Sequence, residues 1–483
     1  LVNKIRAGYA RWRGGILLKE QLSDHGLLKT QAFINGHWID AHDGATIDVR
    51  NPATGEVLAS VAKVGATETA QAIEAAQKAM ESWRNLPAKA RANILRDWFN
   101  IIMAHQEDLA RIMTLEQGKV IAESRGEVAY GASYIEWFAE QAKRIDGDVI
   151  PGPSPDKRIV CIKQPVGVCA AITPWNFPNA MITRKAAPAL AAGCSIVIKP
   201  ASETPLSALA LAELAKRAGI PDGVLNVVVG SSGDIGSELT SNPIVRKLSF
   251  TGSTEVGKLL EAQCVPTLKK TSMELGGNAP FIVFEDADLD SAVQGALISK
   301  YRNSGQTCVC SNRILVQASV ADAFVEKLVA ATSRLSLGNG LAEGVDLGPL
   351  VNNRAVHDVD ALVKATVEAG ATVALGGAPS ELGGNFYQPT ILTHVTPDMA
   401  VFRNEIFGPV APVTVFETEE EAIALANDTE FGLASYFYTR DIGRVWRVSE
   451  ALDYGIVGVN EGIISNEMAP FGGVKESGSG REG

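Results

Sequence analysis

The alternation of strand and helix patterns along residues 166–276 is the feature that most constrains the fold. Apolar strand patterns lie at 166–173, 194–199, 224–229 and 245–250, and helical patterns fill the intervals at 178–191, 204–218, 233–241 and 253–263. Repeated strand–helix units of this length predict a parallel sheet with helices on both faces. Ligands of such sheets bind at the carboxyl ends of the strands. The alternation resumes from about 279 to 460, which predicts a second α/β domain.

The N-terminal part of the chain has a different pattern. Residues 31–61 are typical of strands and turns, and Asn35-Gly36 between apolar residues indicates a hairpin. Apolar residues then recur with the period of a helix. Gly118 is placed to end one helix, as a C-terminal glycine does. We expect three helices here, at about 67–83, 88–116 and 120–142.

Two segments stand outside these patterns. Residues 146–165 contain three prolines ahead of an alternating run, which predicts an edge strand or a hairpin arm that leaves the main body. Such an arm often pairs with another subunit, and a plain linker fits the sequence about as well. Residues 1–28 are expected to be an N-terminal extension. They are not expected to be a signal peptide, because their apolar stretch is too short.

Charge and cysteine usage exclude several classes of protein. The 483 residues carry a net charge of −11, whereas phosphate backbones are bound by positive surfaces, so no nucleic-acid partner is expected. No apolar run approaches the roughly 20 residues that span a membrane. The six cysteines have neither the spacing of a disulfide framework nor that of a zinc site, and no metal is expected. This usage is typical of the reducing cytosol and predicts a cytoplasmic protein.

A cysteine beside a glycine-containing turn is the first candidate for chemistry. In the run that leads from Asn303 to Cys308, the thiol is expected at a bend or helix start, where backbone N–H groups stabilise a thiolate; a buried structural cysteine is the alternative. The six histidines lie outside motif-like segments, so the expected base is a carboxylate. Glu274 is the best placed, because it ends a strand and precedes two glycines. Its partial desolvation raises its pKa toward the range of a general base, and an ordinary turn glutamate is the alternative.

Polar or glycine-rich loops follow three further strands. Gly252 follows a strand and precedes a helix, an arrangement that offers N–H groups and a helix dipole to a pyrophosphate. Lys199 and Ser202 follow another strand, where the adenosine ribose of a dinucleotide lies. An ammonium and a hydroxyl there favour NADP, although the adjacent Glu203 weakens the preference. Asn176 follows the first strand, and its amide can donate to an oxyanion, with a structural turn as the alternative.

Seven motifs, in their order and spacing, resemble the aldehyde dehydrogenase superfamily: TPWNFP, IVIKPAS, FTGSTEVGK, MELGGN, GQTC, NEIFGP and PFGGVKESGSGRE. The resemblance extends from about residue 30 to the end. It implies an α/β fold with a Rossmann-type cofactor domain, an α/β catalytic domain and a small oligomerisation arm. The expected boundaries are 1–28 for the extension, 29–145 and 166–276 for the dinucleotide-binding domain, 146–165 for the arm, 277–476 for the catalytic domain and 477–483 for the start of a truncated C-terminal oligomerisation segment. Relatives continue for about one more strand, so we expect the chain to be a fragment.

The family mechanism implies roles for the residues already singled out. By resemblance, the Cys308 thiolate attacks the aldehyde, the Asn176 amide and the Cys308 N–H hold the oxyanion, and hydride passes to nicotinamide to leave a thioester. Glu274 activates the water that hydrolyses the thioester, which favours an acid-forming reaction over transfer to coenzyme A. Glu405 is expected to hold the nicotinamide ribose. The other residues expected around the dinucleotide are Trp175, Lys199, Ser202, Gly252, Ser253, Thr254 and Leu275.

Further local runs resemble the succinate-semialdehyde dehydrogenase branch, in particular its bacterial members that prefer NADP, with NAD as the alternative. Arg184 and Arg302 resemble the two arginines that bind the far carboxylate of the substrate, and Ser465 resembles their hydroxyl partner. Two arginines that face no carboxylate leave buried charge unpaired, so neutral aldehydes are disfavoured. A structural ion pair of one arginine is the alternative. Glutarate semialdehyde is an alternative substrate, because one more methylene costs only about 1–3 kcal/mol.

The sequence also suggests regulation and assembly. A Cys308–Cys310 disulfide is a hypothetical switch that silences the enzyme under oxidation, and a packing role for Cys310 is the alternative. A non-enzymatic dinucleotide-binding redox sensor is the rival from another class, and Glu274 and Asn176 argue against it because a sensor needs neither a water base nor an oxyanion donor. The resemblance further implies a homo-oligomer, either a dimer or a tetramer.

Overall fold

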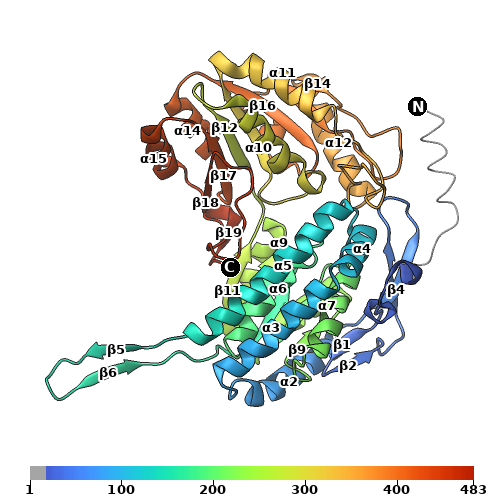
Figure 1. The fold of residues 1–483 in the computed structure, drawn as a ribbon, viewed down its shortest axis with the longest axis vertical. Coiled ribbons are helices and arrows are strands. Elements are labelled where there is room, and N and C mark those ends of the chain that lie inside the picture. The colour runs from blue at the N-terminus through green and yellow to red at the C-terminus, as the bar shows by residue number, and fades with distance from the viewer. Residues whose placement is uncertain (1–17, 483) are drawn as a thin grey trace.

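Two large sheets organise residues 18–482, which the computed structural model describes (Figure 1). The strands of the first sheet are β1 (Ala32–Ile34), β2 (His37–Ile39), β7 (Val168–Ile172), β8 (Ile196–Lys199), β9 (Leu225–Val227), β10 (Val245–Thr251), β11 (Lys270–Glu274) and β19 (Gly478–Ser479). Those of the second are β12 (Ala279–Val283), β13 (Ser311–Gln317), β14 (Thr372–Leu375), β15 (Thr390–Thr393), β16 (Val410–Phe416), β17 (Ala434–Tyr438) and β18 (Ile456–Val459). Two hairpins pair β3 (Thr46–Arg50) with β4 (Val57–Ala62) and β5 (Asp148–Pro151) with β6 (Arg158–Cys161).

Both large sheets are mainly parallel, as the alternation of strand and helix patterns predicted. The first has the order β19-β11-β10-β7-β8-β9-β1-β2, and the run from β11 to β9 is parallel. The second has the order β14-β15-β16-β13-β12-β17-β18, and only its β14 edge is antiparallel. The chain therefore has the predicted α/β fold.

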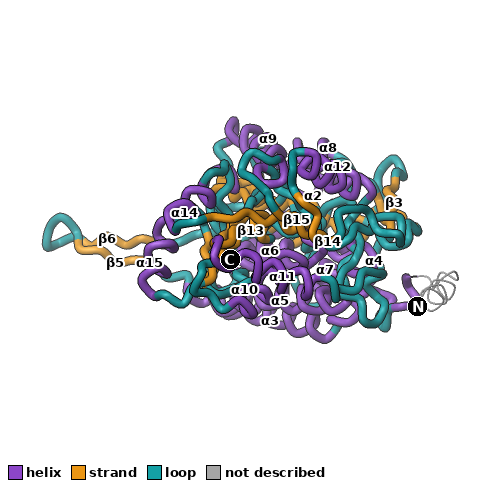
Figure 2. The backbone as a smooth tube through the Cα atoms, turned by 90° about the horizontal axis from the view of Figure 1, so that it is seen from above, coloured by secondary structure: helices purple, strands orange, loops and turns teal. Residues whose placement is uncertain are grey.

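Helices cover both faces of the first sheet and pack around the second (Figure 2). They are α2 (Ala66–Trp83), α3 (Ala88–Ala104), α4 (Gln106–Gln117), α5 (Ile121–Gln141), α6 (Ala180–Ala191), α7 (Pro205–Arg217), α8 (Ser232–Ser241), α9 (Thr254–Cys264), α10 (Leu289–Tyr301), α11 (Ala321–Thr332), α12 (Asn353–Glu368), α13 (Ala400–Arg403), α14 (Glu419–Asn427) and α15 (Ile442–Ala451). Successive strand residues point to opposite faces. Ile196 and Ile198 therefore face a core built mainly from α3 to α7, whereas Val197 faces one built from α2, α8 and α9.

One expected helix is wrong in its extent. The predicted helix over 88–116 is two helices, α3 and α4, which meet at His105. The backbone of His105 has φ −109° and ψ 19°, outside helical geometry, and its ring Nδ1 lies 2.8 Å from the Ile101 carbonyl oxygen. The side chain thus competes with the backbone for a carbonyl at the helix end, which a periodicity of apolar residues does not reveal. The end at Gly118 is confirmed, with φ 101°.

The hairpin and arm predictions are confirmed. Asn35 and Gly36 have φ of 50° and 76°, which suits a tight turn between antiparallel β1 and β2. β5 and β6 form an antiparallel arm that stands away from the body in both views (Figures 1 and 2). All residues of these two strands are exposed.

The two ends of the described chain both pack against the first sheet's unit. Within the expected N-terminal extension, Leu18, Leu22 and Leu27 are buried in the core beside α3 and α4, so this part is not a loose extension. Residues 1–17 lie outside the described residues. At the other end, β19 lies antiparallel to β11 and borders the sheet at Glu274. Among residues 18–482, no helix is long and apolar enough to cross a membrane.

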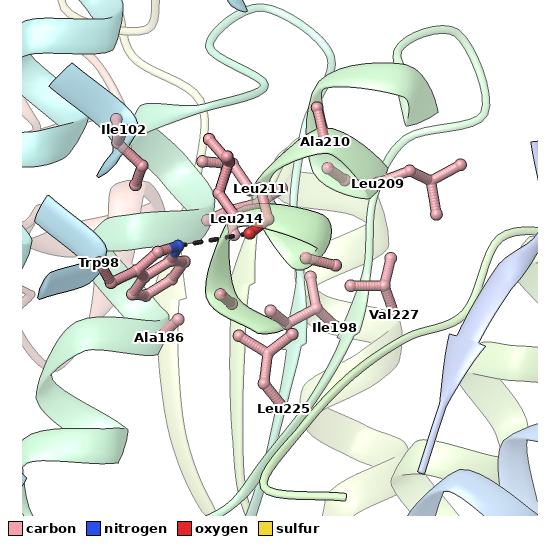
Figure 3. Close-up of a cluster of buried hydrophobic side chains, with 14 of the residues drawn as sticks. Trp98, Ile102, Ala186, Ile198, Leu209, Ala210, Leu211, Leu214, Leu225 and Val227 are labelled. Carbon is pink, nitrogen blue, oxygen red and sulfur yellow. Dashed lines mark hydrogen bonds between the residues drawn. The ribbon is translucent and has the colours of Figure 1, made fainter. Parts of the chain in front are cut away.

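Trp98 on α3 anchors the larger core (Figure 3). Its ring is fully buried among residues of α6, α7 and the strands beneath them, and its Nε1 donates to the Leu211 carbonyl oxygen at 3.3 Å. A buried indole N–H normally finds such a partner, because leaving it unpaired is costly. The contact joins α3 to α7, and α7 in turn covers Ile198 and Val227 of the sheet.

Replacing Trp98 is expected to destabilise the protein in proportion to the volume removed. Trp98→Ala should lower the free energy of unfolding by about 3–5 kcal/mol, because it leaves a large cavity. Trp98→Phe should cost less, since most of the apolar volume stays and only the hydrogen bond and part of the ring are lost. Urea denaturation followed by circular dichroism measures both. Equal losses for the two variants, or a loss below about 1 kcal/mol for Trp98→Ala, would contradict this account.

Candidate active site

A cavity of about 270 Å³ opens where the two sheets meet. One side is formed by the residues that follow β7, β10 and β11, at the strand ends where ligands of parallel sheets bind. The other side comes from the turn before β13 and from loops after α13 and β18. The predicted site residues that line it are Trp175, Asn176, Arg184, Gly252, Ser253, Leu275, Arg302, Cys308, Glu405 and Ser465. The others, Lys199, Ser202, Thr254 and Glu274, lie outside this lining.

Cys308 stands in the turn that leads into β13 and is half-buried. The preceding Asn303 and Ser304 have left-handed backbone, with φ of 53° and 55°. Such a conformation costs an L-residue roughly 1–2 kcal/mol. Two neighbouring helices offset this cost. The Glu123 carboxylate accepts from the Asn303 N–H at 3.0 Å, and the Gln117 amide donates to Asn303 Oδ1 at 2.9 Å. The position of the thiol thus depends on α4 and α5, far away in sequence.

Cys308 lies in a turn, which agrees with the expected bend. The surroundings of its thiol, however, do not favour the expected thiolate. Burial raises the pKa of its thiol to about 12, and the nearby carboxylates of Glu405 and Glu274 raise it further, while Arg184 opposes them. The thiol is therefore neutral at pH 7 and must lose its proton as it attacks. Cys310 is buried, free and directs its thiol to the Lys300 carbonyl oxygen, at 3.6 Å.

Glu274 ends β11 as a buried carboxylate, and neither of its oxygens has a hydrogen-bond partner among the described residues. Burial raises its pKa to about 8, with a further contribution from the Glu482 carboxylate. Glu482 itself is paired, because Lys185 Nζ donates to it and to Thr251 Oγ1, each at 2.6 Å. Gly472 leaves room beside Glu274, since a Cβ there would lie 2.9 Å from Glu274 Oε1. The predicted upward pKa shift of Glu274 by desolvation is confirmed.

The Asn176 side chain points toward the segment that carries Cys308. Its Nδ2 donates to the Gln306 carbonyl oxygen at 3.0 Å. The backbone carbonyl oxygen of Asn176 accepts from Lys119 Nζ at 2.7 Å and from Asn303 Nδ2 at 3.0 Å. The residue is 5% exposed and fixed on both sides, so its amide is held in place at the cavity wall. A fixed donor of this kind needs no reorganisation when a negative oxygen develops beside it.

The edge at β8 and β10 has the groups that a dinucleotide needs. Lys199 ends β8 with its ammonium buried, and burial lowers its pKa. Its one hydrogen-bond partner within residues 18–482 is the Pro200 carbonyl oxygen, at 3.2 Å, so the cation is available to an anion. Ser202 is half-buried in the loop that follows. Ser253 caps the N-terminus of α9, where free N–H groups favour phosphate, and its neighbour Thr254 donates to the Glu476 carbonyl oxygen at 3.3 Å.

A second group of residues completes this edge. Glu405 Oε1 accepts from the Gly277 N–H at 3.1 Å, and burial raises the pKa of its carboxyl to about 7. Leu275 packs closely against α9. A Cβ added at Gly257 of that helix would lie only 2.2 Å from Leu275 Cδ2. Trp175 packs edge-on against Phe407, with ring centroids 5.6 Å apart. These residues fit a nicotinamide dinucleotide.

Arg184 lines the cavity and is buried, with 2% of its surface exposed. Its Nη2 donates to the hydroxyls of Tyr130 and Tyr134, the latter at 2.6 Å. The Phe471 ring lies 4.2 Å from the guanidinium carbon. None of these partners is an acid, and Arg184 has no ion pair within the described residues. The alternative of a structural ion pair is therefore wrong for Arg184.

Arg302 and Lys119 both contact the Phe177 ring. The Arg302 guanidinium carbon lies 5.3 Å from the Phe177 ring centroid, and Lys119 Nζ lies 4.1 Å from it. Arg302 and Ser465 both line the main cavity and a neighbouring one of about 260 Å³. Like Arg184, Arg302 has no ion pair within 18–482. Neither arginine therefore forms a direct ion pair, although the Glu123 carboxylate interacts with Arg302 and that of Glu482 with Arg184 at longer range.

Sequence reasoning missed the residues that support these groups. Tyr130 and Tyr134 hold Arg184, and the ion pair of Lys185 with Glu482 lies beside Glu274. A signal existed for the tyrosines, since two phenols four residues apart share one face of the expected helix. Glu482 is the last residue of the motif PFGGVKESGSGRE, and the sequence predicted no role for it. Its pairing with Lys185 could not be read from the sequence, because nearly three hundred positions separate them. No group of three or more metal-ligating side chains occurs in the part of the chain that the structure describes.

Comparisons with known proteins agree with this geometry. The sequence model of the aldehyde dehydrogenase family matches residues 38–483. Over 463 residues, the chain is 64% identical to glutarate-semialdehyde dehydrogenase of Pseudomonas aeruginosa and 63% identical to NADP⁺ succinate-semialdehyde dehydrogenase of Escherichia coli, with 96% of each chain covered. The crystal structure of an E. coli NADP-dependent enzyme matches with a TM-score of 0.95 at 63% identity, again over 96% of each chain. The protein therefore belongs to the aldehyde dehydrogenase family.

Proposed function

We propose that this enzyme oxidises an aldehyde that carries a carboxylate at its far end, with succinate semialdehyde as the substrate and succinate as the product. The observation that carries the proposal is the pair of cationic side chains without acidic partners, Arg184 and Arg302, in the cavity that Cys308 also lines. Buried charge without a partner is costly, so a ligand carboxylate is the complement that these arginines lack. Ser465 adds a hydroxyl at the same end.

The chemistry divides between three side chains of the cavity region. Cys308 releases its thiol proton to solvent and bonds to the aldehyde carbon to form a thiohemiacetal, whose oxyanion accepts from the Asn176 amide and the Cys308 N–H. A bound nicotinamide would supply the acceptor for the hydride of this carbon, and Cys308 would then carry the acyl group as a thioester. Glu274 takes a proton from water, the water oxygen bonds to the thioester carbon, and the acid leaves as the thiol re-forms. Two easier steps thus replace one difficult step.

We propose NADP as the preferred cofactor and NAD as a weaker one. Lys199 and Ser202 would hold the phosphate that distinguishes NADP from NAD. The Lys199 ammonium supports this, because it forms no ion pair within the described residues. Glu405 would hold the nicotinamide ribose. The name of the E. coli relative, which specifies NADP, agrees with this preference. The remaining contacts would come from Trp175, Gly252, Ser253, Thr254 and Leu275.

Glutarate semialdehyde is the second candidate substrate. It has the same two ends as succinate semialdehyde and one more methylene, which a pocket tolerates at a cost of about 1–3 kcal/mol. Relatives named for each substrate are almost equally similar to this chain, at 64% and 63% identity. The carboxylate that both candidates share is the part that the two arginines recognise.

We further propose that the chain acts as a cytoplasmic homo-oligomer, a dimer or a tetramer, with residues 146–165 as its arm. The arm exposes apolar side chains, with Val149 at 74%, Val160 at 65% and Ile162 at 72% exposure. Exposed strand edges with apolar residues favour pairing with another chain. A second copy of the chain would then cover the arm.

Within one chain, residues 29–145 and 166–276 would bind the dinucleotide, and residues 277–476 would supply the nucleophile.

Removing one arginine should separate charged from neutral substrates. Arg302→Gln is expected to lower kcat/KM for succinate semialdehyde about 10- to 100-fold, because a charge-assisted contact contributes about 1.5–3 kcal/mol. Its kcat/KM for butanal should stay within threefold of the parent value. Arg354→Gln, at an exposed ion pair, is the matched control and should change neither. Spectrophotometric assay of reduced cofactor measures kcat/KM of the parent and both variants with each substrate, and a parent enzyme that prefers butanal would refute the proposed substrate.

The acid-forming step should follow the titration of Glu274. Because its pKa is raised to about 8, the ionised base is scarce at pH 6, grows about tenfold by pH 7 and levels off above pH 8. Thioester hydrolysis should follow this rise. Glu274→Gln should still give one equivalent of reduced cofactor per active site and then hydrolyse the thioester about 10²–10⁴ times more slowly, without the rise. Stopped-flow absorbance measures both phases, and a variant that keeps the parent's pH profile would remove Glu274 from the step.

Cofactor preference should depend on Lys199. Lys199→Ala is expected to lower kcat/KM for NADP about 10- to 100-fold, by loss of a charge-assisted contact, and to change the value for NAD less than threefold. Lys364→Ala, at a lysine with 68% of its side chain exposed, is the control. Titration of both cofactors at saturating semialdehyde provides the measurement. Equal losses with NADP and NAD would place Lys199 against a part that the two cofactors share.

A further inference from the structure

Tyr130 and Tyr134 of α5 both contact the buried Arg184. Tyr130 and Tyr134 lie one helical turn apart, with ring centroids 5.1 Å apart in an edge-on arrangement. Arg184 Nη2 donates to both hydroxyls, and the two hydroxyl oxygens lie 2.7 Å from each other. Arg184 Nε, by contrast, is buried and has no hydrogen-bond partner within the described residues. Nη2 is thus occupied and Nη1 contacts Met181 Sδ at 3.9 Å, whereas the Nε donor is unpaired.

The direction of each hydrogen bond follows from the number of protons. Tyr134 Oη donates to the Asn466 carbonyl oxygen at 3.2 Å. A phenol has one proton, so Tyr134 can only accept from its other two neighbours. Tyr130 therefore donates to Tyr134 and accepts from Arg184. The chain of donors leads from the guanidinium through both phenols to the backbone of the loop that holds Ser465.

A second contact ties the same helix to this loop. Ser133, between the two tyrosines, has one hydroxyl proton, which it shares between the Tyr130 carbonyl oxygen at 2.8 Å and Glu467 Oε2, next in sequence to Asn466, at 3.3 Å. The helix thus holds the loop at two consecutive residues, directly after Ser465. Within the described residues, Arg184 on α6 and Ser465 on the loop form no hydrogen bond with each other, and Tyr134 of α5 bonds both Arg184 and the loop.

We propose that Tyr130 and Tyr134 are positioning residues for carboxylate recognition, which hold the Arg184 guanidinium and the Ser465 loop in register. The inference rests on the proposed function and adds the residues that orient its charged contact. Phenols suit this role because they are neutral. An acid at either position would pair with Arg184 and cancel the charge that attracts the ligand, whereas an apolar residue would leave the guanidinium free to turn.

Removal of one hydroxyl should weaken binding of the charged substrate and leave the chemistry intact. Tyr134→Phe keeps the ring and loses both the contact to Arg184 and the contact to the loop. We expect KM for succinate semialdehyde to rise about tenfold, equivalent to about 1.4 kcal/mol, with kcat within twofold. KM for butanal, which has no carboxylate, should stay within twofold. The inhibition constant of succinate against the aldehyde should rise in parallel with the first KM.

A double-mutant cycle tests whether the hydroxyl acts through the arginine. In an Arg184→Gln background, Tyr134→Phe should raise KM for succinate semialdehyde less than about threefold, because the arginine that it orients is gone and only its contact with the Ser465 loop is lost. Tyr454→Phe is the matched control. That phenol also accepts from a buried arginine, Arg313, and donates to a backbone carbonyl, but it lies outside the cavity lining. It should lower the melting temperature without changing the ratio of the two KM values.

The outcomes distinguish this inference from the proposed function. A parent enzyme without preference for the carboxylate-bearing aldehyde would refute the proposed function and this inference with it. A parent with that preference, together with a Tyr134→Phe variant whose two KM values rise equally or not at all, would refute the positioning role alone. An undiminished tenfold effect in the Arg184→Gln background would do the same, because the hydroxyl would then act on the ligand by another route.

Discussion

Parallel pairing of β10 with β7 on one side and β11 on the other is the constraint on which the cavity depends. Phe250 lies level with Ile172 in one neighbour and with Met273 in the other, so the three strands end together. The loops that follow must therefore leave from the same edge. This brings the amide of Asn176, the start of α9 and the carboxylate of Glu274 to one place. The second sheet then needs only to deliver the turn with Cys308 against that edge.

Desolvation determines how these groups behave once they are assembled. Burial raises the pKa of both Glu274 and Glu405, and it raises that of the Cys308 thiol. Arg184, in contrast, keeps its charge among neutral phenols and an aromatic ring. The cavity region thus holds carboxyl groups of raised pKa and an arginine without a direct ion pair, a combination that suits proton transfer and anion binding.

Much of the fold could be predicted from local patterns, because strand and helix periods and glycine positions act over a few residues. The parallel strands, the hairpin at Asn35 and the helix end at Gly118 are of this kind. The failures share a different cause. The helix break at His105 arises from a side chain that bonds a backbone carbonyl. The packing of Leu18 depends on helices much later in the chain, which no local pattern reveals.

The sequence by itself determined which chemical groups the protein has and which motifs surround them: a thiol in a glycine-containing turn, a carboxylate at a strand end and two arginines. Only the tertiary structure decided their protonation and their partners. Glu274 is raised in pKa by burial and by Glu482, and Arg184 is held by Tyr134 rather than by an acid. The reason is physical. Solvent exclusion and charge compensation depend on neighbours that are distant in sequence, and folding alone brings them together.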